Sequence, residues 1–241
     1  LTNNHVVEGA DAIEVVLQDA RRTPAKVIGT DPESDLAVLK IDLDKLPVMT
    51  LGDSDALQVG DQVLAIGNPF GVGQTVTSGI VSALGRNQLG INTFENFIQT
   101  DAAINPGNSG GALTDIHGNL MGVNTAIYSR SGGSMGIGFA IPVSIAKQVM
   151  ESIVTNGRVV RGWIGVEPTD LTPELAETFG IKAGEQGVII TGVLNNGPAG
   201  QAGIRPGDVI AQIDGKPVAS VSALLSGVSA LKPGQAAPFT V

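Results

Sequence analysis

The feature that most constrains the fold of this chain is the alternation of short apolar runs with turn residues between Ile13 and Ile141. The runs are rich in valine and isoleucine, which favour strands. Among the 241 residues, 33 glycines and 13 prolines are available for tight turns. The pattern predicts a mainly β fold, a barrel or a sandwich, with strands at residues 13–17, 26–28, 36–41, 62–66, 75–82, 120–125 and 137–141.

A helix pattern follows Pro142 and ends this β-rich part. Apolar residues recur there with the spacing of one helix face, and Asn156-Gly157 is a typical helix stop. We therefore place a domain boundary at the stop, which gives one domain at residues 1–157 and a second at 158–241.

The second domain is predicted to be small and of the α+β class. Strand-like runs occupy residues 188–194 and 209–213, and Asp214-Gly215 is a turn signal. An apolar helix pattern covers residues 220–231.

Composition excludes several classes of function. The 14 basic and 23 acidic residues give a net charge of −9, which repels a phosphate backbone, so no nucleic-acid partner is expected. The chain has no cysteine, which excludes disulfides, thiol catalysis and cysteine-based zinc sites. Asp53-Ser54-Asp55 lacks the remaining ligands of a calcium loop, and the glycine-rich segment 67–73 lacks the lysine of a phosphate loop. We expect no metal and no cofactor.

The segment most informative about chemistry is a serine set among glycines, Asn105-Pro106-Gly107-Asn108-Ser109-Gly110-Gly111. Glycine permits a turn that exposes backbone amides, and a serine nucleophile needs such amides, here those of Gly107 and Ser109, to stabilise an oxyanion. The segment also fits a structural turn and the G-x-S-x-G elbow of α/β-hydrolases. The elbow order places the histidine last, and only His117 follows, beside a predicted turn. The esterase hypothesis therefore fails.

His5 and His117 are the two histidines of the chain, so the general base for Ser109 must be one of them. His5 is the better candidate because it lies at the predicted end of a strand, where a side chain faces a cleft. Asp35 opens an apolar strand, as suits a partly buried carboxylate that orients the imidazole. Asp31 stays open as its rival, although Asp31-Pro32 also fits a surface turn.

The order His5, Asp35, Ser109 resembles that of chymotrypsin-like enzymes, and the segments around these residues resemble the signatures of HtrA/DegS-type proteases in family order. Those segments are Thr2–Val7, Asp35–Lys40, Gly67–Phe70, Gln99–Ala102 and Gly107–Gly111. The resemblance implies a chymotrypsin-like double β-barrel in which His5 is the general base, Asp35 orients it and Ser109 is the nucleophile.

The same resemblance implies further roles. It makes Gly107, Asn108 and Ser109 the oxyanion hole, and it places Arg86 in a regulatory loop, where an ordinary solvated arginine is the alternative. Pro106 departs from the family pattern. The resemblance also implies that strands precede Leu1 in the whole protein. A strand that pairs with the backbone of a polypeptide substrate would consist of Asn124, Thr125, Ala126, Ile127 and Tyr128.

In the second domain, the glycine-flanked residues Trp163, Ile164, Gly165 and Val166 form either an edge strand or a nest of amides for a carboxylate. Segments between Gly197 and Val218 resemble a PDZ domain of the bacterial protease type, which implies the second role. Leu225 and Val228 on the predicted helix would line the peptide pocket, or else belong to the core. The resemblance also implies that a further strand follows Val241.

The sequence thus predicts a serine endopeptidase that cleaves misfolded or regulatory envelope proteins and responds to C-terminal peptides of such proteins at its PDZ domain. By resemblance it is a homotrimer in the periplasm, anchored to the inner membrane by a segment ahead of this chain. One PDZ domain favours a DegS-like regulator, and a longer DegP-like protease stays open. A peptide-binding module with an inactive protease scaffold is the alternative.

Overall fold

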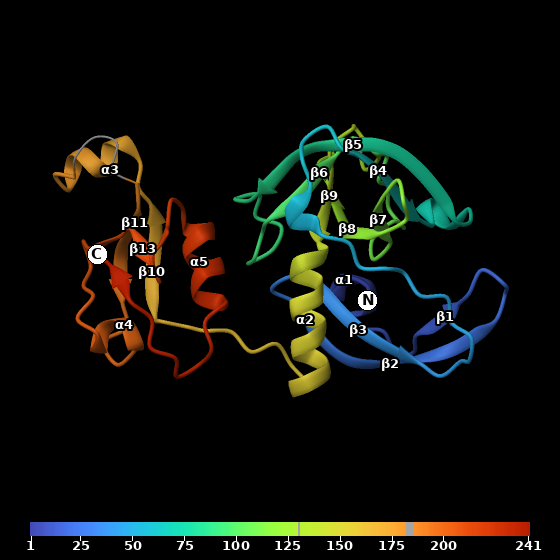
Figure 1. Ribbon diagram of the computed structural model, residues 1–241, viewed down its shortest axis with the longest axis horizontal. Coiled ribbons are helices and arrows are strands. Elements are labelled where there is room, and N and C mark those ends of the chain that lie inside the picture. The colour runs from blue at the N-terminus through green and yellow to red at the C-terminus, as the bar shows by residue number, and fades with distance from the viewer. Residues whose placement is uncertain (130, 182–185) are drawn as a thin grey trace. The chain divides into compact units, whose positions relative to one another are not determined.

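The structure is a computed structural model that describes residues 1–129, 131–181 and 186–241. The chain divides into two compact units, Leu1–Val159 and Val160–Val241 (Figure 1). Both are built largely from short strands, so the mainly β prediction is confirmed. No helix in the described ranges combines the length and the apolar character that crossing a bilayer requires.

A three-stranded antiparallel sheet forms the start of the first unit. Its strands are β1 (Glu14–Val16), β2 (Arg22–Asp31) and β3 (Leu36–Ile41), in that order. The helix α1 (Asn4–Val7) precedes the sheet, and a bridge from Thr2 to Ala37 ties the N-terminal segment to β3. The sequence predicts His5 at the end of a strand and the start of a turn. It lies on a one-turn helix, and the residue in extended pairing before it is Thr2. A single turn is too short to show helical periodicity in the sequence.

Six further strands close into an antiparallel barrel. Their order is β4-β5-β6-β9-β8-β7, and their bounds are β4 Gln62–Gly67, β5 Thr75–Arg86, β6 Phe97–Thr100, β7 Ala112–Asp115, β8 Leu120–Ile127 and β9 Gly138–Pro142. Short 3₁₀ helices precede and follow β4, at Ser54–Ala56 (η1) and Pro69–Gly71 (η2). Val63 and Ala65 of β4 point inward with Val81, Ile98 and Leu113, as the period-two burial of a strand requires.

The helix α2 (Val143–Asn156) joins the sheet to the barrel (Figure 1). It buries Ala146, Val149 and Ile153 against a cluster that includes residues of β3 and of the barrel strands. Gly157 ends it in the left-handed conformation with φ 75°, as the Asn-Gly stop predicts. The same apolar cluster therefore holds both sheets of the first unit together.

The second unit consists of two small sheets around one core. One sheet has the order β10-β11-β12, the other β14-β13-β15. The elements are β10 Val166–Asp170, α3 Pro173–Thr178, β11 Val188–Val193, α4 Pro198–Gln201, β12 Val209–Ile210, β13 Gln212–Ile213, β14 Lys216–Pro217, α5 Val221–Ser229 and β15 Phe239–Thr240.

Two features of this unit differ from the sequence prediction. The run 209–213 is not one strand, because its halves β12 and β13 pair with different sheets and the amide of Ala211 donates to Thr240 O (2.9 Å). The predicted helix 220–231 is shorter at both ends, and Ser220 caps it by accepting a hydrogen bond from the amide of Ala223 (3.1 Å).

Candidate active site

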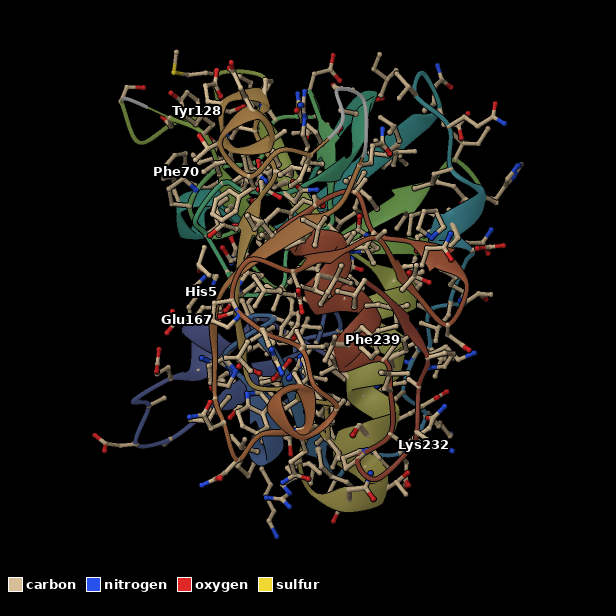
Figure 2. The ribbon with its side chains drawn as sticks, turned by 90° about the vertical axis from the view of Figure 1, so that its left-hand side faces the viewer. His5, Phe70, Tyr128, Glu167, Lys232 and Phe239 are labelled. Carbon is tan, nitrogen blue, oxygen red and sulfur yellow. The ribbon has the colours of Figure 1, made fainter. Side chains whose placement is uncertain are left out.

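The acid and the base of the predicted site are in direct contact. His5 Nδ1 lies 2.7 Å from Asp35 Oδ2, and the backbone amide of His5 donates to Asp35 Oδ1 at 2.9 Å. The carboxylate thus takes an amide of the first turn of α1 as well as the imidazole, which fixes both the ring and its backbone. Asp35 is buried, while His5, labelled in Figure 2, is exposed.

Asp35 adopts an unusual backbone conformation. Its φ is 57°, in the left-handed region where aspartate and asparagine are tolerated better than most residues. The rival Asp31, also buried, instead accepts a hydrogen bond from the Ser34 hydroxyl. The structure therefore places Asp35, and not Asp31, against His5.

Thr125 completes the surroundings of the carboxylate. Its hydroxyl donates to Asp35 Oδ2 at 2.7 Å. Asp35 Oδ2 accordingly accepts from both Thr125 and His5. The sequence singled out Thr125 only for its backbone; the role of its side chain depends on β8 reaching β3, which no local pattern reveals.

The loop that carries Ser109 is held by close backbone packing. A Cβ on Gly107, whose φ is 102°, would lie 2.3 Å from Asn68 O, and one on Gly111 would lie 2.1 Å from Ile66 O. Both positions therefore require glycine. The glycine-rich composition that marks the segment in the sequence has this steric cause.

Two amides of the loop are free to bind an oxyanion. Pro106 O accepts from the amide of Phe70 (2.8 Å), so the other end of that planar peptide, the Gly107 N–H, points away from η2. Asn108 O accepts from the amide of Gly111 (3.0 Å), which likewise turns the Ser109 N–H outward. Within the described residues neither N–H has an acceptor.

The third predicted member of the oxyanion hole is corrected. The amide of Asn108 donates to Asn105 O at 3.0 Å and is not available to a ligand. Its side chain is buried, with Nδ2 at 3.5 Å from Ala103 O. Asn108 thus belongs to the frame of the loop, which leaves the amides of Gly107 and Ser109 as the candidate donors.

The Ser109 hydroxyl donates to Thr125 O at 3.3 Å. In the described part of the chain no hydrogen bond joins it to His5. A cavity of about 380 Å³ opens beside the acid–base pair and is lined by His5, Asp35, Ile91 and Ala126, among others. The hydroxyl must turn from this carbonyl toward the imidazole before His5 can take its proton.

The strand predicted to hold substrate is the end of β8. On the side that faces β7, β8 pairs as far as Val123. The amide of Asn124 then donates to Gly111 O, and Asn124 O accepts from the amide of Gly110. From Thr125 to Ile127 the described strands pair only on the β9 side. Asn124 itself is fully buried, with Nδ2 donating to Ile66 O and Ala112 O, so its role is to hold the barrel rather than to meet a ligand. Tyr128, exposed beyond the strand, is labelled in Figure 2.

Arg86 ends β5 on the surface of the same unit. Its Nε donates to Gln99 Oε1 of β6 at 2.8 Å. The contact is between neighbouring strands and does not reach His5 or Ser109, so the structure adds a defined partner but no catalytic role. His117 lies in an exposed turn, where its amide donates to Asp115 Oδ1 (2.9 Å).

In the second unit, the segment Trp163–Gly165 is a loop that leads into β10 at Val166. Gly165 has φ 77°, and Trp163, the single tryptophan of the chain, is 62% exposed. The outer edge of β10 pairs with no described strand, since its one partner is β11. A loop followed by a free strand edge suits the addition of a peptide strand.

The two residues of α5 predicted to line the peptide pocket differ in their burial. Val228 is buried in the core of the unit, which corrects its prediction as a pocket residue, because its side chain packs among Ile213, Val218 and Leu224. Leu225 lies outside that cluster and is half-buried. A cavity of about 430 Å³ adjoins the loop and is lined by Trp163, Ile164, Lys232 and Phe239, of which the last two are labelled in Figure 2.

Family models and relatives agree with this description. The "Trypsin-like peptidase domain" model matches residues 1–123, and the "PDZ domain" model matches residues 162–241. A probable periplasmic serine endoprotease, DegP-like, of Chlamydia trachomatis is 52% identical over 234 residues, which are 97% of this chain and 47% of the relative. Periplasmic serine endoprotease DegP of Escherichia coli K12 is 51% identical over 97% of this chain and 49% of its own. The chain spans about half the length of these curated relatives.

Solved structures extend the comparison. The HtrA-type protease AlgW with a decapeptide is 61% identical, has a TM-score of 0.89, and is matched over 97% of this chain and 72% of its own. AlgW with a tripeptide matches at 61% identity and a TM-score of 0.89, over 97% and 77%. Likeness of this extent, together with a trypsin-like match over half of the residues, shows that the chain belongs to the HtrA-type serine proteases.

Proposed function

We propose that this chain is the catalytic and peptide-sensing part of a serine endopeptidase, with Ser109 as nucleophile, His5 as general base and Asp35 as the group that orients His5. The single observation that carries the proposal is the His5–Asp35 contact at 2.7 Å in a unit whose Ser109 loop leaves two amides free. An isolated feature would fit a structural role; a base, its orienting acid and two free donors beside a serine fit acyl transfer.

The reaction follows from these positions. Ser109 Oγ attacks the carbonyl carbon of a peptide bond while His5 takes the hydroxyl proton, and the amides of Gly107 and Ser109 stabilise the oxyanion. His5 then gives the proton to the leaving amine, which leaves an acyl-enzyme. Water attacks the acyl-enzyme by the same steps, with His5 again as base, and restores Ser109.

The substrate class is a polypeptide in extended conformation. Thr125 to Ile127 offer backbone groups on the side of β8 that pairs with no described strand, next to Ser109. A peptide laid along that edge brings its carbonyl to the nucleophile. We propose misfolded or regulatory envelope proteins as the substrates, in keeping with relatives named periplasmic endoproteases.

The second unit supplies regulation in this proposal. C-terminal peptides of envelope proteins bind along β10, with the terminal carboxylate at the loop of Trp163, Ile164 and Gly165, and Leu225 contacts the last side chain. Relatives solved with peptides support this assignment. Arg86 is part of the link to the active site, and Ser109 reacts faster when peptide is bound. The periplasm, a homotrimer and an inner-membrane anchor complete the proposal.

A fluorophosphonate probe, which reacts with activated serine hydroxyls, tests the function in the full-length protein. We expect labelling of the parent, in the presence of a peptide with a free C-terminal carboxylate, and none of Ser109→Ala. Tandem mass spectrometry should find the adduct on Ser109. A parent that stays unlabelled at every peptide concentration, while it still binds peptide, would establish the alternative, a binding module with an inactive protease fold.

A further inference from the structure

Asn3 has a polar side chain in an unusual setting. It is fully buried and stands at the N-cap of α1, where an asparagine ordinarily accepts a hydrogen bond from an amide of its own helix. It makes no such bond. The amide of His5, which a capping side chain would take, donates to Asp35 instead. The Asn3 carboxamide is therefore directed away from its own helix.

Both polar atoms of that carboxamide are used in contacts distant in sequence. Nδ2 donates to Asp35 O at 2.9 Å, and Oδ1 accepts from the amide of Gly110 at 2.6 Å. Asp35 O can accept only from the NH₂ group of Asn3, and the Gly110 N–H can donate only to the carboxamide oxygen. The two partners therefore define the orientation of the Asn3 carboxamide. One side chain thus bridges the residue that orients His5 and the residue that follows Ser109.

We propose that Asn3 is a positioning residue for the reaction, which sets the separation between the His5–Asp35 pair and Ser109. The proposal rests on the proposed function and adds to it a group that touches neither substrate nor the reacting atoms. Asp35 lies just before β3 and Ser109 just before β7, which belong to different sheets, and the Thr125 hydroxyl constrains only the carboxylate of Asp35, so the relative placement of the two backbone segments needs a further link. A rigid, doubly bonded carboxamide between their backbones fixes it.

Asparagine is the residue that suits this position. Aspartate has no donor for Asp35 O, and alanine has neither atom. Gly110 has its own requirement, since a Cβ there would lie 2.2 Å from Thr2 Oγ1 and its φ is 78°. Residues 2 and 3 therefore pack closely against the serine loop. If the bond between Asn3 and Gly110 is lost, no larger side chain at Gly110 can fill the space.

The test uses the full-length protein with saturating C-terminal peptide and the fluorophosphonate probe. The maximal labelling rate and the probe concentration for half of that rate are measured separately, together with the final labelled fraction. For Asn3→Ala we expect the maximal rate to fall roughly 10- to 100-fold, as a displaced catalytic group does, with the half-saturating concentration and the final fraction unchanged. The maximal rate of Asn3→Asp should fall at least as far, because a carboxylate oxygen then faces the Asp35 carbonyl.

Ser54→Ala is the matched control. Its hydroxyl is also buried, and it joins η1 to α2 by contacts with Ser144 (3.1 Å) away from the site. If Asn3 is purely structural, Asn3→Ala and Ser54→Ala should both lower the labelled fraction and leave the labelling rate per labelled site at the parent value. That result would overturn the positioning role. If Asn3→Ala fails to fold, the same criterion applies to Asn3→Asp. An unlabelled parent refutes the proposed function itself.

Discussion

The two halves of the candidate active site are held in place by different means. Asp35 and His5 are fixed by side-chain hydrogen bonds, with the carboxylate accepting from the imidazole, from the His5 amide and from Thr125. The Ser109 loop is fixed by glycines packed against backbone, and its serine hydroxyl is bonded to Thr125 O and not to the base. The carboxylate and imidazole of the acid–base half are already in contact, whereas in the nucleophile half the serine hydroxyl is bonded to a carbonyl and the Gly107 and Ser109 amides have no described acceptor.

Control of the reaction is easier at one half of the site than at the other. A carboxylate with three donors has little freedom to change, because each lost hydrogen bond to a buried charge costs about 1.5–3 kcal/mol. The amides of Gly107 and Ser109 have no described acceptor, so a change in their direction breaks no hydrogen bond at these two groups. Regulation by a peptide bound elsewhere should therefore act on the Gly107–Ser109 side and leave the His5–Asp35 contact as it is.

Asp35→Asn gives the largest expected effect on the acid–base half. Asparagine tolerates the left-handed φ of 57°, so the fold should survive, but an amide favours the wrong imidazole tautomer. We expect kcat to fall on the order of 10⁴-fold in a peptide-hydrolysis assay. Asp31→Asn is the control, because it changes the rival buried carboxylate, which does not contact His5; its kcat should stay far above that of Asp35→Asn. Equal losses in both variants would refute the assignment of Asp35.

Gly107→Ala tests the nucleophile half. The Cβ would lie 2.3 Å from Asn68 O at φ 102°, so the loop must rearrange and its amides move. We expect kcat to fall about 10²- to 10³-fold, the cost of losing an oxyanion donor, and added peptide should not restore it. Gly118→Ala, with φ 83° and open space around it, is the control for backbone strain alone. Full activity in Gly107→Ala would show that the loop geometry is not needed.

Peptide amidation tests the sensor. Replacing a C-terminal carboxylate with an amide removes the charge that the loop amides at Trp163–Gly165 would bind, so Kd should rise roughly 10- to 100-fold. Because Trp163 is the only tryptophan and is exposed, its fluorescence reports the binding. The free acid should also raise the fluorophosphonate labelling rate at a concentration where the amide does not. Equal Kd values from titration would exclude carboxylate recognition.

Thr125→Val gives the smallest expected effect. It removes the hydroxyl that donates to Asp35 Oδ2 at 2.7 Å and keeps nearly the same volume, while His5 still contacts the carboxylate. We expect kcat to fall about tenfold, equivalent to ~1.4 kcal/mol. Thr125→Ser, which keeps the hydroxyl, should retain most of the activity. Loss of equal size in both variants would assign the effect to packing rather than to the hydrogen bond.

Much of the fold could be predicted from local pattern. The bounds of β3 and the glycine stop of α2 agree with the structure because alternation and capping are properties of a few neighbouring residues. The run 209–213 was not predictable in this way, since its division depends on two different partner sheets. Helix α1 is a single turn and has no period to detect.

The candidate site divides in the same way. Ser109 and Asp35 stand out locally, one among glycines and the other at the mouth of an apolar run. Asn3 and the side chain of Thr125 have no such signal, because their partners are up to 107 residues away. Val228 follows the helical spacing that fits either a core or a pocket, and only its neighbours decide in favour of the core.

The closure of the barrel by β9 has a consequence for timing during synthesis. A ribosome completes His5, Asp35 and Ser109 before Thr125 of β8, and β9 at Gly138–Pro142 is the last strand to enter between β6 and β8. An incomplete chain therefore contains all three reactive residues but lacks the Thr125 hydroxyl that donates to Asp35 and the closed barrel that supports the serine loop. Reactivity should therefore appear only once the whole first unit has folded.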